Sequence, residues 1–212
     1  MQQATTTEPE NPKGKLRPLG KPGSHWEYND IRINQFSLVL IHLFQRALPD
    51  VLAEYVMQPL MLAAAENDPT SGWHWHGYEN SWIKLNGKQL QSVPGGGHWG
   101  GGMVISAEAQ AAIARLVLPG VRSATSSNAL SQEWRQLMVT PCDLAPYYGF
   151  FTWLNTDHCI SKSASVNSFF AMGIGGQVIM HDPDADLVAV YRWIDSDHTN
   201  EIIELTYNIA GR

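Results

Sequence analysis

The chain has 212 residues, of which 44% are apolar and 16% are charged, and its formal net charge is -6. A chain of this length can bury a full hydrophobic core, and these fractions are typical of an ordinary soluble globular protein. The negative charge argues against a nucleic-acid partner, because phosphate binding requires a concentrated basic face. No apolar run has the length of a membrane span, so we expect no membrane partner.

The first 22 residues differ from the rest of the chain. They contain four prolines, few apolar side chains and no apolar core of the kind found in a signal peptide. We therefore expect a flexible lead-in over residues 1–22 and a folded domain over residues 23–212. Localisation stays open, with the cytoplasm as the default.

The next segments predict helices and a hairpin. Residues 30–46 hold such a dense run of apolar side chains that we expect a helix buried on most of its surface. Pro49 favours the first turn of a second short helix that ends near Met57. Asn86-Gly87 lies between two alternating runs and predicts a two-residue hairpin turn.

The pattern changes from helix to strand in the second half. Ser106 and Ser131 are predicted N-caps of two more helices, over residues 107–118 and 132–139. Four short strand patterns follow, "YGFFTWLN", "NSFFAMGI", "GQVIMHD" and "LVAVYRWI", and a helical pattern closes the chain. Helices followed by an antiparallel meander and a closing helix indicate an α+β fold.

Two segments rich in histidine or glycine could bind a ligand. "PGGGHWGGG" has no Lys and no βαβ context, so it favours tight turns over a phosphate site. His74 and His76 could form a three-histidine zinc site with His98, but no acidic residue lies at a ligand spacing. We therefore favour histidines that pack at the rim of a cleft, and we expect neither a metal nor a cofactor.

Tyr28 and Asp30 lie directly before the first predicted helix. A phenol at the mouth of a core helix can exchange a proton with a nucleophile or leaving group, and Asp30 could orient it. Alternatively, Tyr28 packs and Asp30 is only an N-cap. The residues alone leave both readings open.

Five segments, in order, resemble the serine β-lactamase-like, penicillin-binding-protein-like family, closest to class C-type serine hydrolases, esterases and amidases. They are "PGSHWEYNDIRIN", "WHWHGYENSWIKLNGKQLQSVPGGGHWGGGMVIS", "SQEWRQLMVTP", "YGFFTWLN" and "GIGGQVIMHDPDADLVAVYRWID". The resemblance covers residues 20–210 and implies the C-terminal part of such a domain. The implied fold is a sandwich of antiparallel sheet and helices without the family's N-terminal helix and first two strands.

Members of the family act through three sequence elements in a fixed chain order. The first is Ser-x-x-Lys, the second is Tyr-x-Asn, and the third is Lys- or His-Thr/Ser-Gly on a strand. By this resemblance Tyr28 is the acid/base, with Asp30 where the family has Asn, and Gly173 is the glycine of the third element. Trp99 is implied as a substrate contact in a Trp-lined cleft. The third element lacks its cation and hydroxyl, so a small neutral ester or amide is a better substrate than a lactam antibiotic.

The first element is missing, because the only Ser-x-x-Lys is Ser81 to Lys84, after Tyr28 and on the predicted hairpin. Residues three apart on a strand project to opposite faces, so this pair cannot act together. The resemblance thus implies a serine acyl hydrolase whose nucleophile is not in this chain. The alternative is a non-catalytic remnant or pseudoenzyme that binds small amphiphiles. "LVAVYRWI" would be an uncovered sheet edge, so we also expect self-association there.

Overall fold

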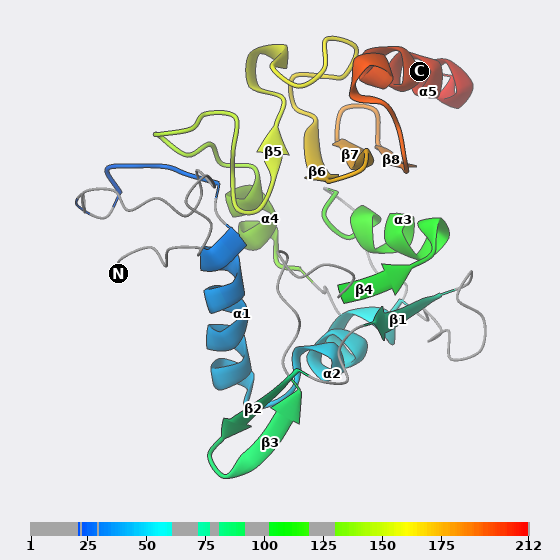
Figure 1. Ribbon diagram of the computed structural model, residues 1–212. Helices are drawn as coiled ribbons and strands as arrows, with labels where there is room; N and C mark the ends of the chain where they lie inside the picture. Colours follow the sequence, from blue (N-terminus) through cyan, green and yellow to red (C-terminus); the bar gives the residue numbers. More distant parts are fainter. Residues whose placement is uncertain are drawn as a thin grey trace. The chain divides into compact units, whose positions relative to one another are not determined.

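The computed structural model in Figure 1 describes residues 21, 23–28, 30–60, 72–76, 81–91, 102–118 and 130–211. The chain forms two compact units, which are described separately below. The first comprises Met1–Gln58 and Ala63–Ile105, and the second comprises Pro59–Leu62 and Ser106–Arg212. The predicted lead-in, residues 1–22, lies outside the described part except for Lys21.

Unit 1 begins with two helices. Helix α1 spans Asp30–Phe44, and α2 spans Leu48–Leu52 with Pro49 in its first turn, as predicted. A π-helical turn, Ala53–Met57, continues α2. The expectation that α1 is mostly buried is wrong: Ile41 is fully buried, but Val39 and Leu43 are 58% and 72% exposed. Apolar density predicted the helix correctly, but it did not predict how much of the surface a neighbour covers.

The strands of unit 1 form two antiparallel pairs. Strands β2 (Trp82–Leu85) and β3 (Lys88–Gln91) form the predicted hairpin. Asn86 and Gly87 have φ angles of 48° and 79°, which the type I′ turn requires at both positions. Strands β1 (Trp73–His76) and β4 (Gly102–Ile105) also pair. The second pair was not predicted, because its strands are far apart in the sequence.

Unit 2 is built on a four-stranded antiparallel sheet with the order β5-β6-β7-β8, seen in Figure 1. The strands follow the predicted runs, although the first run yields only a two-residue strand. Their bounds are Trp153–Leu154 for β5, Phe169–Gly173 for β6, Gln177–Asp182 for β7 and Leu187–Tyr191 for β8. Short turns join β6 to β7 and β7 to β8, which makes the predicted meander.

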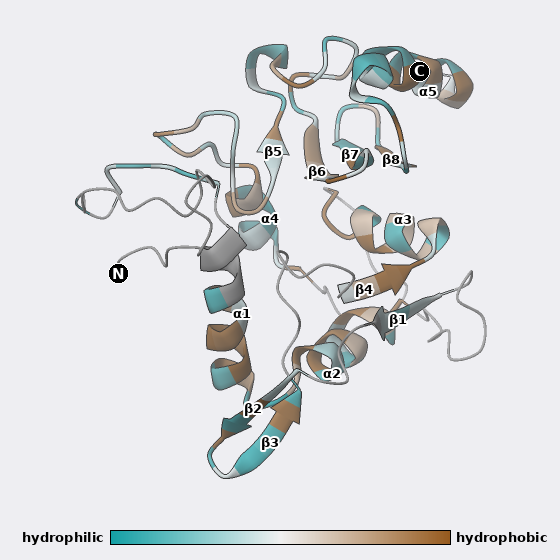
Figure 2. Ribbon diagram, in the orientation of Figure 1, coloured by the Kyte–Doolittle hydropathy of each residue, from teal (hydrophilic) through white to brown (hydrophobic). Residues whose placement is uncertain are grey.

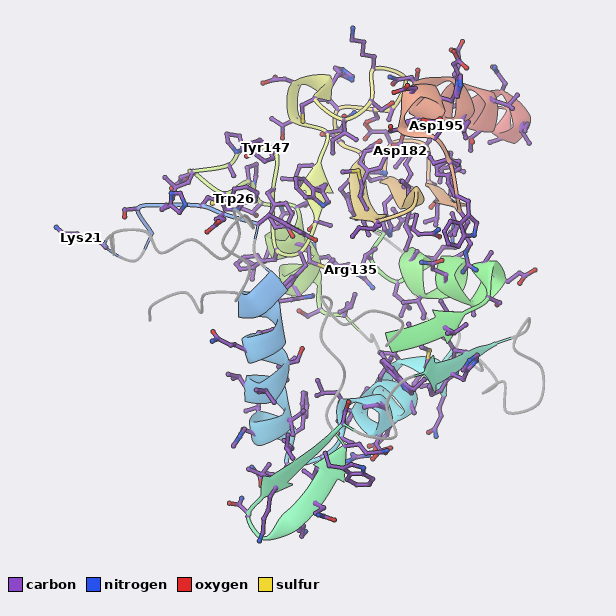
Figure 3. All side chains as sticks on the ribbon, in the orientation of Figure 1. Lys21, Trp26, Arg135, Tyr147, Asp182 and Asp195 are labelled. Carbon is purple, nitrogen blue, oxygen red and sulfur yellow. The ribbon has the colours of Figure 1, made fainter. Side chains whose placement is uncertain are left out.

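Three helices accompany this sheet: α3 (Ala107–Arg115), α4 (Gln132–Met138) and α5 (Thr199–Ala210). The Oγ atoms of Ser106 and Ser131 each accept a backbone N–H at 3.1 Å at the start of α3 and α4, as predicted. Arg135 of α4, labelled in Figure 3, donates from Nε to the carbonyl of Leu116 at 2.9 Å. This bond ties α4 to the end of α3. Two 3₁₀ turns, Thr156–His158 and Ser196–His198, precede β6 and α5.

The sheet buries side chains on both faces. Phe170 contributes to the cluster that includes Ile203 of α5, while its neighbour Phe169 contributes to the cluster that includes Leu118 after α3. Adjacent strand residues point to opposite faces, so β6 serves both clusters and is drawn as an apolar strand in Figure 2. Each fully buried large side chain stabilises the fold by roughly 1.5 to 3 kcal/mol. Helices packed against an antiparallel sheet confirm the predicted α+β class.

A buried asparagine fixes the long connection between β5 and β6. The amide of Asn155, which is fully buried, donates to the carbonyls of Ser161, Ala164 and Ser165 at 2.9 to 3.3 Å. Its Oδ1 accepts the N–H groups of Ile160 and Ser161 at 3.1 and 2.9 Å. One side chain therefore fixes the part of this loop that follows its 3₁₀ turn.

Replacing this asparagine is expected to destabilise unit 2. Asn155→Ala leaves several buried backbone groups without partners, so we expect the free energy of unfolding to fall by about 3 to 5 kcal/mol. Urea denaturation followed by circular dichroism measures the loss. The matched control is Asn208→Ala on α5, an exposed position where the change is expected to stay within about 0.5 kcal/mol. Equal effects of the two substitutions would contradict this role for Asn155.

Candidate active site

Near its C-terminal end, strand β6 has no described strand beside it on the side that faces β5. The N–H of Asn155 donates to the carbonyl of Ser168 at 3.0 Å, and in this register Trp153 pairs with Phe170. Because the N–H and C=O groups of successive residues point to opposite sides of a strand, those of Met172 point the same way as those of Ser168 and Phe170. Strand β5 begins only at Trp153, so the Met172 backbone groups face past its end, at an edge that no described strand covers.

The chain before β5 turns away from β6, and local contacts explain why. Thr152 Oγ1 donates to the carbonyl of Met138 at 2.6 Å, and Gly149 donates its N–H to the Thr152 carbonyl at 2.9 Å. A Cβ on Gly149 would lie 2.1 Å from the Met138 carbonyl oxygen, so only glycine fits there. Phe151 adopts a φ of 56°, which is uncommon for an aromatic residue. These constraints end the pairing and open the edge.

The turn after β6 is held against the chain that leaves β8. Gly176 accepts the N–H of Ile194 at 3.2 Å, and a Cβ on Gly176 would lie 1.9 Å from the Ile194 carbonyl oxygen. Its φ of 69° also favours glycine. Gly173, the residue predicted from the resemblance, is the last residue of β6. A Cβ there would make only an ordinary contact, 3.5 Å from Gln177 Cβ, so packing does not require glycine at this position.

Two ionisable side chains of unit 2 have pKa values that burial shifts. His181 of β7 stacks on Phe169 with ring centroids 4.5 Å apart, and burial lowers its pKa to about 4. It is therefore neutral at neutral pH. Burial, and then a hydrogen bond to Asp182, raise the pKa of Tyr207 to about 12. Asp182, labelled in Figure 3, also accepts the N–H groups of Asp184 and Ala185 and so closes the turn between β7 and β8.

The open edge itself is electrically neutral. Residues 169–178 contain no Asp, Glu, Lys, Arg or His. The edge can therefore offer a ligand backbone donors and acceptors but no charge. This chemistry suits a neutral carbonyl, which accepts a backbone hydrogen bond, better than a carboxylate, which requires a cation.

The other predicted site residues belong to unit 1 or lie outside the described part. Tyr28 is 43% exposed and lies two residues before the start of α1, in the extended segment where Figure 3 labels Trp26. Asp30 is the first residue of α1, and its side chain is outside the described part, so its predicted capping or orienting role is untested. Trp99 also lies outside the described residues.

The described residues offer little to a metal ion. The residues that the structure describes contain no group of three His, Cys, Asp or Glu side chains placed to hold a metal. His74 lies on β1, which confirms the extended segment, but the side chain of His76 and all of His98 are outside the described part. The three-histidine arrangement is therefore untested.

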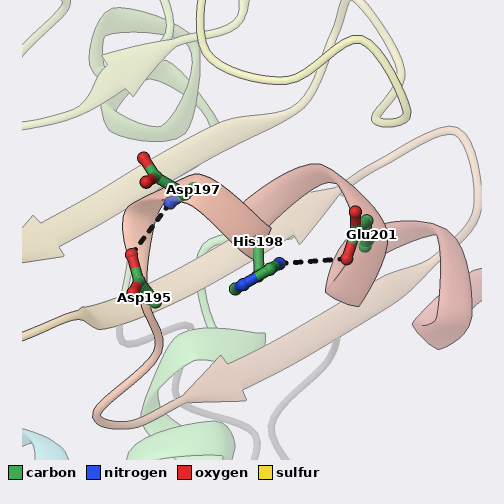
Figure 4. A network of polar contacts seen from close by, with 4 residues as sticks. All are labelled: Asp195, Asp197, His198 and Glu201. Carbon is green, nitrogen blue, oxygen red and sulfur yellow. Dashed lines mark hydrogen bonds and ion pairs between the residues drawn. The ribbon is translucent and has the colours of Figure 1, made fainter.

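Figure 4 shows an exposed polar network at the start of α5. Asp195 Oδ1 accepts the N–H of Asp197 at 3.1 Å, and His198 Nδ1 lies 3.1 Å from Glu201 Oε2. Both contacts are between near neighbours in the sequence, and they stabilise the first turns of the helix. The network has no arrangement that would bind or transform a ligand.

Within the described part, no single helix is long and apolar enough to cross a membrane. The bent pair Gln35–Phe44 and Leu48–Met57 satisfies the length and composition criteria only when its two helices are taken together.

Comparisons with known proteins agree with this architecture. Residues 10–202 match the family model described as Beta-lactamase. The chain belongs to the beta-lactamase family. A crystal structure of a beta-lactamase from Mycobacterium bovis is similar, with a TM-score of 0.59 and 15% sequence identity over 92% of this chain and 67% of that chain. At this identity the likeness supports the fold alone. No curated protein matches the chain.

The family match confirms the resemblance that the quoted segments predicted. Sequence reasoning placed the third element at Ala171 to Gly173, which the structure places at the end of β6. It missed the edge of β6 at Met172 that no described strand covers, because the point where a neighbouring strand ends has no sequence signature of its own. The left-handed conformation of Phe151, at the point where the chain before β5 leaves β6, has no sequence signature either.

Substitution of the two turn glycines separates packing from backbone preference. Gly176→Ala brings a methyl group onto the Ile194 carbonyl, and we expect a loss of about 2 to 4 kcal/mol in the free energy of unfolding. Gly87→Ala on the β2–β3 hairpin is the matched control, since Gly87 has φ 79° but nothing within 4 Å of a Cβ. It is expected to cost only about 1 kcal/mol. Equal losses in thermal or urea denaturation would show that the close approach at Gly176 has no energetic effect.

Proposed function

We propose that the chain is the C-terminal part of a serine acyl hydrolase that acts on a small neutral ester or amide. Membership of the beta-lactamase family supports a function of the serine-hydrolase type. The observation that carries the finer proposal is the open, uncharged edge of β6 at Met172. A backbone N–H there can stabilise the oxyanion of an acyl-transfer reaction without any contact to a carboxylate.

The roles follow the order of an acyl transfer. A serine Oγ attacks the acyl carbon and loses its proton, and the negative charge that develops on the carbonyl oxygen is stabilised by backbone N–H groups. The alcohol or amine then leaves with a proton, and water releases the acyl group. We assign proton transfer to Tyr28, with Asp30 to orient it, and carbonyl binding to the β6 edge that ends at Gly173. Trp99 remains a proposed substrate contact.

Ser81 does not fit the role of nucleophile. It directly precedes β2, and Lys84 lies within that strand on the confirmed hairpin. A Ser-x-x-Lys pair acts through one turn of a helix, which brings the amine onto the hydroxyl, whereas a strand separates the two side chains. We therefore place the nucleophile outside these 212 residues.

The alternative is a pseudoenzyme that binds small amphiphilic molecules without turnover. The same neutral edge supports it, because binding at an uncharged backbone edge does not require a covalent step. The two proposals differ in one measurable property, which is the formation of an acyl-enzyme.

The decisive experiment labels the chain and an N-terminally extended form with a fluorophosphonate. We expect no adduct on the 212-residue chain and an adduct on the serine of an in-frame upstream Ser-x-x-Lys. In the extended form, Tyr28→Phe is expected to lower kcat for p-nitrophenyl butyrate by about 10²- to 10⁴-fold. Tyr55→Phe is the matched control, because Tyr55 is also exposed, at 57%, and is assigned no role.

Three outcomes would contradict parts of this proposal. An adduct on Ser81, located by peptide mass spectrometry, would overturn the argument from strand geometry. An extended form that binds esters without acylation would favour the pseudoenzyme. Equal activity of the Tyr28→Phe and Tyr55→Phe variants would remove Tyr28 from the mechanism.

We also propose that the chain self-associates through β8. In the described part β8 pairs only with β7, at one end of the strand order. The registers of β6 with β7 and of β7 with β8 show which backbone groups of β8 point outward. The N–H groups of Leu187, Ala189 and Tyr191 point toward β7. Those of Val188 and Val190 point away from the sheet. An outward row of backbone groups is a template for pairing with a second copy.

Proline substitution tests this edge. Val190→Pro removes only an outward N–H, so we expect it to abolish concentration-dependent association in sedimentation velocity with little loss of stability. Ala189→Pro is the matched control, because it removes a hydrogen bond to β7 and is expected to lower the midpoint of urea unfolding clearly. A wild-type chain that stays monomeric at all concentrations would refute the proposal.

A further inference from the structure

Side-chain amides link the tip of the β2–β3 hairpin to the end of α1, both within unit 1. Asn86, the first residue of the hairpin turn, donates from Nδ2 to Oε1 of Gln45 at 2.7 Å. Gln45 directly follows α1 and donates from Nε2 to the carbonyl of His42 at 2.6 Å. Figure 1 shows the hairpin beside the C-terminal end of α1. We refer to these two hydrogen bonds as the amide bridge.

The amide bridge helps to end the helix. The last carbonyl groups of a helix have no partner within it, and the side chain of Gln45 supplies a donor to one of them. Gln45 has a φ of 53°, and its N–H donates to the carbonyl of Ile41 at 2.9 Å. Its backbone therefore ends α1 while its side chain contacts the hairpin. Gln45 and Asn86 are both exposed, so water reaches the bridge.

The same turn contains a chemically labile pair. Asn86-Gly87 is the only Asn-Gly in the sequence. Asparagine is thermolabile because the backbone nitrogen of the next residue can attack its side-chain carbonyl carbon. A side chain on that next residue hinders the attack, and glycine has none. A Cβ on Gly87 would meet nothing within 4 Å, and the N–H that closes a turn of this register is that of Lys88. The Gly87 nitrogen is therefore accessible to water and to base.

We propose that Asn86 is a modification site at which spontaneous deamidation releases the hairpin from α1. The Gly87 nitrogen loses its proton to a base in the solvent and forms a bond to Cγ of Asn86. The bond between Cγ and Nδ2 breaks, and the nitrogen leaves as ammonia. Water then opens the cyclic imide to give aspartate or isoaspartate. The sequence consumes one water, releases one ammonia and involves no oxidation or reduction.

Both products are incompatible with the amide bridge. A carboxylate only accepts hydrogen bonds, so at position 86 it would face Oε1 of Gln45, which is also an acceptor. Gln45 could turn its amide nitrogen toward the carboxylate only by losing its bond to His42. A negative charge at the C-terminal end of α1 is also unfavourable, because the helix dipole is negative there. Isoaspartate in addition lengthens the main chain by one atom, which a two-residue turn does not accommodate.

The intact bridge slows this reaction. The side chain of Asn86 must bring Cγ to the Gly87 nitrogen before the ring can close, and this movement requires its amide to leave Gln45. The net contribution of one hydrogen bond corresponds to about a two- to tenfold difference in rate. The fold therefore delays its own modification, and opening of the bridge permits it.

Ageing of the 212-residue chain in mildly alkaline buffer made with heavy-oxygen water tests the site. Peptide mass spectrometry is expected to find the labelled oxygen at Asn86, and an isoaspartate methyltransferase is expected to modify part of the same peptide. Asn208 on α5 is the internal control, because it is also exposed but is followed by Ile209, whose side chain hinders ring closure. Asn208 is expected to stay unlabelled while Asn86 is converted.

Variants test the bridge separately from the turn. Gln45→Gly keeps a residue that favours positive φ after a helix but removes the side-chain bonds, so we expect about two- to tenfold faster deamidation of Asn86. Asn86→Asp carries the product carboxylate and is expected to speed hydrogen exchange at the backbone N–H of Gln45, as ageing of the wild-type chain does. Asn208→Asp is the matched control, because it adds the same charge away from the bridge and is expected to leave this exchange unchanged.

Four results would overturn the inference. An unlabelled Asn86 when the urea-unfolded chain is fully converted, or equal labelling of Asn86 and Asn208, would remove the modification site. A wild-type rate of deamidation in Gln45→Gly, or equal hydrogen exchange at Gln45 in Asn86→Asp and Asn208→Asp, would remove the bridge. No readout here involves acyl transfer, so failure of the proposed hydrolase would leave this inference in place.

Discussion

The antiparallel ladder between β6 and β7 is the constraint on which unit 2 depends. Five residue pairs, from Phe169↔His181 to Gly173↔Gln177, fix the register of β6. This register sends Phe169 and Phe170 to opposite faces, where they contribute to the two hydrophobic clusters. It also decides which backbone groups of β6 face outward. A shift of one residue would exchange the buried faces and turn the Met172 groups inward, so core packing and the candidate site are fixed by the same pairing.

Much of this fold follows from local sequence signals. Ser106 and Ser131 predicted the starts of α3 and α4, Asn86-Gly87 predicted a hairpin, and the apolar runs predicted β6, β7 and β8. Each signal is contained within a few residues, so it can be recognised from the sequence alone. The pairing of β1 with β4 was not predicted, because its partners are joined only by tertiary contacts. The exposure of α1 was also misjudged, since composition does not show what covers a helix.

The candidate site was only partly predictable, for a physical reason. Tyr28 and Gly173 came from a resemblance between motifs, and a motif carries side-chain identity. The β6 edge depends on backbone geometry instead. The sequence "YGFFTWLN" does not indicate that Phe151 adopts a left-handed conformation, nor that the chain separates from β6 there. By contrast, His181 and Tyr207 have shifted pKa values for structural reasons, since His181 is buried and Tyr207 is partly buried and hydrogen-bonded to Asp182.

The pairing of β1 with β4 has a consequence for synthesis on the ribosome. The strands of the β6–β7–β8 meander are joined by short turns, so each can pair almost as soon as it leaves the exit tunnel. Strand β1, with Trp73 and Trp75, emerges well before its partner Gly102–Ile105 exists. During that interval two large apolar side chains have no strand to pair beside, and they are available to a chaperone or to another nascent chain. The β1–β4 pair can therefore form only after residue 105 has emerged, whereas each strand of the meander meets its partner within a few residues.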